Sequence, residues 1–204
     1  MKTETYLLRD GSAINIPIPG SYRDCMVLIK SDYFRIYGYT DNFLKIWLKT
    51  FKCKQLKFLF WFRLTCYMGG VYVLCKLIHK HLQTKYGCQL EAGTKVGWGL
   101  YIGHGISMVI TPCCIIGNNV NLSQMINIGT NEQNQAIIGD NVYIGPMSCI
   151  VEGVHIGNNV IIGAGSVVTR DIVPNSTAAG VPAKVIGPNK HQSYVQNRWA
   201  YRRR

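Results

Sequence analysis

Between Ile138 and Val168 the sequence repeats with a strict period of six residues. An aliphatic residue stands at positions 138, 144, 150, 156, 162 and 168, and in most repeats a small residue, usually Gly, follows it. No α-helical period gives a strict repeat of six, and simple strand alternation does not place Gly after every third hydrophobic residue. Short fixed periods of this kind are typical of hexapeptide β-helices, in which each repeat forms one short strand and one corner.

The same pattern extends upstream in two further registers, which begin at Leu90 and at Ile110. Three repeats make one triangular coil, so residues 88–187 predict about four to five coils stacked roughly 4.8 Å apart. The register slips by eight residues between Ile102 and Ile110 and by ten between Ile128 and Ile138. We expect both slips to form loops outside the prism, where repeat scaffolds usually place their chemistry.

The net charge of +12 is unevenly distributed over the 204 residues. Residues 1–87 carry 14 Lys or Arg and 5 Asp or Glu, residues 88–187 carry 3 and 5, and residues 188–204 carry 5 and 0. The repeat region is therefore almost neutral and the two ends are basic. Such ends suit an anionic membrane surface as well as they suit nucleic acid.

The eight cysteines show no Cys-x-x-Cys spacing, and the opening MKTETYLLRDG lacks the apolar core of a secretory signal. We expect free thiols that are mostly buried as small hydrophobic side chains, and a cytoplasmic protein.

Residues 1–87 predict an arm followed by helices. Residues 1–20 indicate an extended arm that ends at Pro19-Gly20, and helical patterns follow over 22–37, from Asp41 onward, and over 54–83. The longest uncharged run in the last segment, 64–75, has twelve residues, whereas a spanning helix needs about twenty. We therefore predict no transmembrane segment.

Two interpretations of residues 43–83 remain open. In one, a small helical bundle packs on the β-helix or on a neighbouring subunit. In the other, an interfacial helix places Phe58, Phe60, Trp61 and Phe62 in lipid and its cations at the headgroups. These cations are Lys45, Lys49, Lys52, Lys54, Lys57 and Arg63.

Several segments resemble a known family: GLYIGHGISMVI, IIGNNVNLSQMINIG, NVYIGPMSCIVEGVHIGNNVIIGAGSVVTRDI and AAGVPAKVIG. Together they are similar to the hexapeptide-repeat acyltransferases, above all to the serine acetyltransferase branch with its surface-polysaccharide O-acetyltransferases. The resemblance covers about residues 88–187, and KSDYFR and FLFWFRL resemble the helical appendage of the polysaccharide-modifying members. It implies a mainly β fold, a left-handed parallel β-helix with an α-helical N-terminal appendage, a homotrimer with active sites between subunits, and acetyl-CoA bound between neighbouring prisms.

His104 is the candidate catalytic base. It lies at the first register slip between Gly103 and Gly105, which leave room for a substrate to approach. An imidazole titrates near neutrality and can accept a hydroxyl proton. The resemblance assigns this role to the histidine of the segment, and the alternative is a histidine that only caps a loop.

The residue that orients this histidine in serine acetyltransferases is an Asp, and Gln89 stands at the corresponding position here. Glu91 is the nearest carboxylate in sequence. It either turns toward His104 or is solvated, and the sequence leaves both alternatives open.

The resemblance also implies which residues bind acetyl-CoA. Small residues would line the pantetheine channel, and two cations would stand near the nucleotide phosphates. Each glycine could also simply be a corner residue. The predicted set is Gly129, Thr130, Gly145, Pro146, Gly163, Ala164, Arg170 and Lys184.

His155 ends its repeat and is expected to point outward. A zinc site built on this scaffold would need three histidines at a subunit junction, and residues 88–187 hold only His104 and His155. We therefore predict direct acetyl transfer without a metal.

The acceptor is predicted from two departures from the serine acetyltransferase pattern. Gln135 replaces a carboxylate-binding His in the loop TNEQNQA, and Gly103 replaces the Asp before the catalytic His. The first hypothesis is therefore O-acetylation of a saccharide of capsule, exopolysaccharide or lipopolysaccharide, at the inner face of the membrane. Serine O-acetylation for cysteine synthesis is the enzymatic alternative. A non-catalytic scaffold that binds membrane or nucleic acid through its basic ends is the third, although we expect no nucleic-acid partner and a solvated tail WAYRRR.

Overall fold

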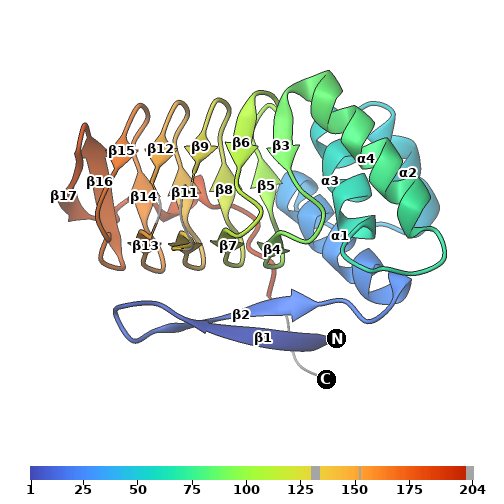
Figure 1. The fold of residues 1–204 in the computed structure, drawn as a ribbon, viewed down its shortest axis with the longest axis horizontal. Coiled ribbons are helices and arrows are strands. Elements are labelled where there is room, and N and C mark those ends of the chain that lie inside the picture. Colours follow the sequence, from blue (N-terminus) through green and yellow to red (C-terminus); the bar gives the residue numbers. More distant parts are fainter. Residues whose placement is uncertain (130–133, 152, 201–204) are drawn as a thin grey trace.

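The computed structural model describes residues 1–129, 134–151 and 153–200. Its centre is a three-sided parallel β-helix of about four turns, which confirms the predicted fold class (Figure 1). Each side is a sheet, which we name after its first strand. The β3 face consists of β3 (Cys88–Leu90), β6 (Met108–Ile110), β9 (Asn127–Ile128), β12 (Cys149–Ile150) and β15 (Val167–Val168).

The chain passes from the β3 face to the β4 face, then to the β5 face, and returns one level further along. The β4 face consists of β4 (Lys95–Val96), β7 (Ile115–Ile116), β10 (Ile137–Ile138) and β13 (His155–Ile156). The β5 face consists of β5 (Tyr101–Ile102), β8 (Asn121–Leu122), β11 (Tyr143–Ile144), β14 (Ile161–Ile162), β16 (Ser176–Gly180) and β17 (Ala183–Pro188).

The six-residue period places the aliphatic residues inside the prism in vertical rows. On the β4 face, Ile138 lies between Ile116 and Ile156, and all three are fully buried. Each buried Ile or Val contributes roughly 1.5–3 kcal/mol, so these rows stabilise the prism. The first register slip is a corner with additional residues, as predicted, whereas residues 130–133 of the second lie outside the described part.

The corner between the β4 and β5 faces explains the repeated Gly-Asn-Asn and Gly-Asp-Asn. The Asp140 carboxylate accepts a hydrogen bond from the Asn118 amide at 2.7 Å, and the Asn158 side chain accepts one from the Asp140 amide at 2.7 Å. In addition, the Asn141 side-chain amide donates to the Asn159 side chain at 3.1 Å. Backbone groups left unpaired by the turns are thereby satisfied.

Four helices lie at one end of the prism (Figure 1). The first is α1 (Tyr22–Tyr37), as predicted, and α2 (Phe43–Thr50) begins after the N-cap Asn42, two residues later than the expected start at Asp41. The predicted segment 54–83 is two helices, α3 (Lys54–Leu64) and α4 (Tyr72–Tyr86). In the part of the chain that the structure describes, none of the helices has the length and apolarity needed to cross a membrane.

The interfacial interpretation of α3 was wrong. Phe58, Phe60 and Phe62 are at most 2% exposed, and Arg63 is fully buried. Because α3 packs against α1, α2 and α4, its aromatic residues form part of the core, as the bundle interpretation predicted.

A buried ion pair joins this bundle to the first coil. Arg63 Nε donates to the Asp32 carboxylate at 2.7 Å, and the same guanidinium donates to the carbonyl oxygens of Val96 and Gly97. The Asp32 carboxylate also accepts from the Leu100 amide at 2.8 Å. Two helices and one corner of the β-helix therefore share one polar network.

Residues 1–20 form a hairpin rather than a lone extended arm. The strands β1 (Lys2–Leu7) and β2 (Ala13–Ile18) pair in antiparallel register, and the hairpin lies along the β4 face (Figure 1). Ile14 and Ile16 are buried against Ile115 and Ile137, which point outward from that face. The hairpin forms because both partners bury apolar surface.

The chain after β17 is docked on the β5 face as far as Trp199, so the first residue of the tail WAYRRR is not solvated as we expected; residues 201–204 lie outside the described part. Val195, beside the short helix η1 (Gln192–Tyr194), is buried, and Asn121 donates to the Tyr194 carbonyl at 2.7 Å. The Trp199 amide donates to the Asn119 side chain, also at 2.7 Å. The tail therefore returns along the prism toward the helices.

Replacing Asp32 with Ala should destabilise the protein by about 3–5 kcal/mol, because it leaves the Arg63 guanidinium buried without its counter-charge. Urea denaturation measures the free energy of unfolding. Lys80→Ala, which removes only a solvated ion pair with Glu91, is the matched control and should change it far less. Equal effects of the two substitutions would contradict the role given to the buried pair.

Candidate active site

His104 lies on the corner that connects β5 with β6, which we call the His104 corner. Its side chain is exposed and its backbone has a φ of 58°. A positive φ is uncommon for a residue with a side chain. The neighbouring glycines fix this geometry, since the Gly105 amide donates to the Gly103 carbonyl at 2.7 Å.

Both glycines beside His104 lie against neighbouring elements, and Gly105 has a positive φ of 58° that favours glycine. The Gly103 amide donates to the Leu122 carbonyl of the next coil at 2.7 Å. A Cβ added at Gly105 would lie 3.1 Å from Gln55 Cγ, at the start of α3. The His104 corner is thus held between the β-helix and the helical bundle. Among the described residues the imidazole makes no hydrogen bond, which leaves it available to a substrate.

Four of the predicted cofactor residues are stacked above His104 on the same corner. They are Gly145 and Pro146 after β11, and Gly163 and Ala164 after β14. A Cβ on Gly145 would lie 2.6 Å from the Ala164 amide nitrogen, and one on Gly163 would lie 2.9 Å from Ala179 Cβ. Coil stacking therefore requires both glycines, and their role toward acetyl-CoA stays a prediction.

The other predicted residues lie elsewhere. Gly129 and Arg170 are at the corner that leads from the β3 face to the β4 face, and Lys184 is exposed on β17. Thr130 lies outside the described residues. A Cβ on Gly129 would meet nothing closer than Asn127 Oδ1 at 3.8 Å, so packing does not require glycine there.

Glu91 does not orient His104 within one subunit. It follows β3 and lies on a different corner of the first coil, where its carboxylate is 3.3 Å from Lys80 Nζ. Gln89, at the position of the family's Asp, points outward from the β3 face and is exposed. The described part of this subunit therefore supplies His104 with no carboxylate partner.

The β3 face is the side of the prism that neither the hairpin nor the tail covers. Val109 on this face is 45% exposed, and Met125 and Met147 on the His104 corner are 55% and 62% exposed. Sequence analysis missed these residues, although their position in the repeat, outside the aliphatic rows, was a usable signal. His104 therefore lies at the edge of an open, partly apolar surface.

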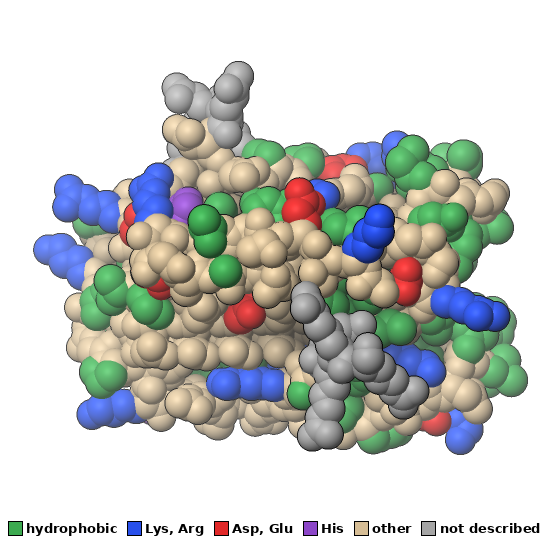
Figure 2. All heavy atoms as spheres, turned by 90° about the horizontal axis from the view of Figure 1, so that it is seen from below, with side chains coloured by type: hydrophobic (Ala, Val, Ile, Leu, Met, Phe, Trp, Pro, Cys, Tyr) green, Lys and Arg blue, Asp and Glu red, His purple; other side chains and the backbone are tan. Residues whose placement is uncertain are grey.

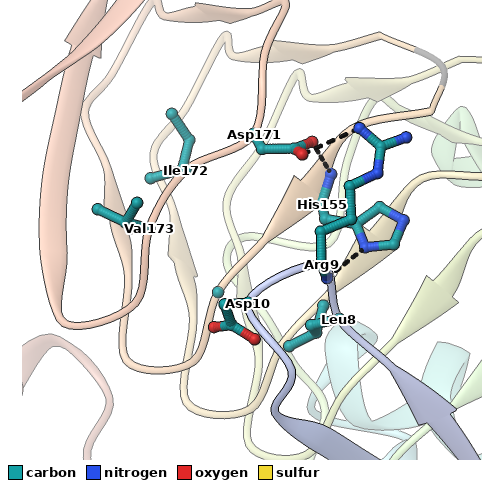
Figure 3. Close-up of a pocket in the computed structure, with 8 residues that line it drawn as sticks. Leu8, Arg9, Asp10, His155, Asp171, Ile172 and Val173 are labelled. Carbon is teal, nitrogen blue, oxygen red and sulfur yellow. Dashed lines mark hydrogen bonds and ion pairs between the residues drawn. The ribbon is translucent and has the colours of Figure 1, made fainter.

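A separate cavity of about 220 Å³ lies where the tip of the hairpin meets β13 (Figure 3). His155 points outward here, as predicted, and its Nδ1 accepts a hydrogen bond from the Arg9 amide at 3.1 Å. Asp171 accepts from the His155 amide and from the Arg9 guanidinium, at 2.8 Å and 2.9 Å. These contacts fasten the hairpin to the prism. In the described ranges, no three His, Cys, Asp or Glu side chains are grouped so as to hold a metal ion.

Docking of the hairpin should weaken in mild acid. Burial, followed by the Arg9 charge, lowers the pKa of His155 although Asp10 and Asp171 lie nearby. The folded imidazole therefore favours the neutral form, and stability is complete above the unfolded pKa of about 6.5 and falls as the pH drops below it. Hydrogen exchange of the Arg9 amide, corrected for intrinsic rates, should show less protection at pH 5 than at pH 7.5. His155→Gln should flatten this dependence, and an unchanged pH profile would contradict the assignment.

Comparison with known proteins agrees with the β-helical fold. Residues 135–170 match the family described as bacterial transferase hexapeptide (six repeats). The matched residues run from just before β10 to just after β15, within the β-helix. The chain is 35% identical over 119 residues to mitochondrial serine acetyltransferase 3 of Arabidopsis thaliana, a match that covers 56% of this chain and 30% of the relative.

A serine acetyltransferase of Staphylococcus epidermidis is 33% identical over 124 residues, which cover 59% of this chain and 58% of the relative. The chain thus spans less than two thirds of the length of either relative. The serine acetyltransferase of Neisseria gonorrhoeae, solved in complex with serine, shares the fold with a TM-score of 0.67 at 24% identity, over 81% of this chain and 70% of that one.

Proposed function

We propose that this protein is an acetyl-CoA-dependent O-acetyltransferase with His104 as its general base. The observation that supports this most strongly is the position of His104, an exposed imidazole at the edge of the open β3 face. The relatives are named as serine acetyltransferases, and each match covers more than half of this chain. A base at this position can act on a hydroxyl without a covalent enzyme intermediate.

In this mechanism His104 removes the proton of the acceptor hydroxyl while its oxygen attacks the thioester carbonyl. The tetrahedral intermediate collapses when the carbon–sulfur bond breaks, and the imidazolium returns the proton to the CoA thiolate. General base catalysis of this kind is typically worth 10²–10⁴-fold in rate. Hydrogen-bond donors facing the developing oxyanion would contribute further.

A trimer would complete the site. The His104 corner borders one edge of the β3 face, and the corner with Gly129 and Arg170 borders the other. Packing around a threefold axis is heterologous, so one edge of each subunit meets the opposite edge of its neighbour. The two groups of predicted cofactor residues, which are separated within one chain, would then meet across the interface with acetyl-CoA between them.

The relatives favour serine as the acceptor over the saccharide that sequence analysis placed first. Gln135 and Gly103 still favour a neutral hydroxyl compound such as a sugar, because neither side chain carries a charge to pair with those of an amino acid. We therefore place serine first and a saccharide second. Release of CoA from acetyl-CoA, with L-serine and with surface-glycan fragments as alternative acceptors, distinguishes them.

His104→Asn should lower the rate of CoA release by 10²–10⁴-fold with the preferred acceptor. Asn tolerates the positive φ at this position, so the loss would reflect the missing base and not a disturbed corner. His81→Asn, at an exposed position on α4, is the control and should leave turnover unchanged. Full activity of His104→Asn would refute the mechanism.

Val109→Glu should convert the trimer to monomers and abolish turnover, since three carboxylates would be buried around the axis. Light scattering measures the assembly. Ile186→Glu, an exposed position on β17, should leave the mass unchanged. A trimer that survives Val109→Glu would mean that another face makes the contact.

A further inference from the structure

The outer surface of α2 is apolar at positions where a solvated helix is normally polar. Phe43, Leu44, Leu48 and Phe51 are between 51% and 62% exposed, while Ile46 on the opposite side is fully buried. Large apolar side chains that gather on one exposed surface indicate an interaction site.

Helix α4 has a second surface of the same kind. Val73, Leu74 and Leu77 are between 57% and 68% exposed, and Cys75 and His79 on the inner side are buried. Both helices pack on α3, and both lie at the end of the molecule opposite β17 (Figure 1). Hydrophobic side chains gather there with Lys and Arg side chains, at the right-hand end of Figure 2.

The charged side chains between Asn42 and Leu90 are all positive. No Asp or Glu occurs from Asn42 to Leu90, whereas nine Lys or Arg do. Arg63 is buried with Asp32, but Lys45, Lys52, Lys76 and Lys80 are exposed beside the apolar residues of α2 and α4. Asp41 and Glu91, which flank the region, neutralise only part of this charge.

We propose that α2 and α4 together form a docking surface for an anionic lipid bilayer. Apolar side chains bordered by lysines match the two layers of such a membrane, because the apolar groups enter the boundary of the acyl chains while the ammonium groups remain among the headgroups. A second copy of the chain is a poor partner for the same surface, since the lysines of the two copies would face one another.

This surface differs from the interfacial helix that the sequence suggested. The aromatic residues of α3 are in the core, so α3 supports α2 and α4 from beneath and does not enter lipid. The His104 corner packs against Gln55 at the start of α3, so it belongs to the coil nearest the bundle. Docking would therefore bring the proposed active site close to the membrane surface, where a lipid-linked acceptor would be within reach.

The test measures sedimentation of the full chain with lipid vesicles. One set of vesicles is phosphatidylcholine alone, and in the other about 30% of the lipid is anionic phosphatidylglycerol. We expect binding only to the anionic vesicles, and release at high salt because the attraction is screened. Each of Lys45→Gln and Lys52→Gln should weaken partitioning about fivefold. Leu44→Glu combined with Leu48→Glu should abolish it, with an unchanged melting temperature because both positions are exposed.

Ile186→Glu, an equally exposed apolar position at the far end of the prism, is the matched control and should bind vesicles like the unaltered chain. Two outcomes would overturn the proposal. One is vesicle binding that persists in the double variant Leu44→Glu, Leu48→Glu, or that is equally strong with neutral and anionic vesicles. The other is the absence of vesicle binding together with an assembly larger than a trimer that these substitutions dissociate, which would identify the surface as a contact between copies. Neither outcome depends on turnover.

Discussion

The close stacking of successive coils is the constraint on which the rest of this structure depends. The backbone of each corner lies directly against the next, so that a Cβ added at Gly117 would be 2.5 Å from the Gly139 carbonyl oxygen. Particular corner positions therefore require glycine, and others hold residues such as Asn at a positive φ. His104 occupies a corner of this type, and its exposure follows from the backbone conformation that stacking imposes.

The buried Asp32–Arg63 pair sets where the prism begins. The two charged side chains form hydrogen bonds with carbonyl and amide groups of the first coil. No preceding coil exists to supply partners for these groups. Charges in such a place are unfavourable unless every group is paired, and here the helices supply the partners. The bundle therefore caps the open end of the β-helix and also positions the His104 corner through Gln55.

Two further segments decide which surface remains for function. The hairpin covers the β4 face by burying Ile14 and Ile16, and the tail covers the β5 face through Tyr194 and Trp199. Both segments are short and held by few contacts compared with the prism. Their common effect is that one face, with a proposed catalytic residue at its edge, is left open to a neighbouring subunit.

The sequence by itself determined the β-helix, because a strict six-residue period of this kind is typical of that fold. It pointed to His104 as a candidate base through the slip after Ile102. It also predicted α1 to the residue, because Ser21 and Gly38 mark its ends. Only the tertiary structure decided that Phe58 and Arg63 are buried, that Glu91 pairs with Lys80, and that the hairpin and tail cover two faces. Local patterns report the period and ends of an element, whereas these outcomes depend on contacts between residues far apart in the chain, which no local pattern specifies.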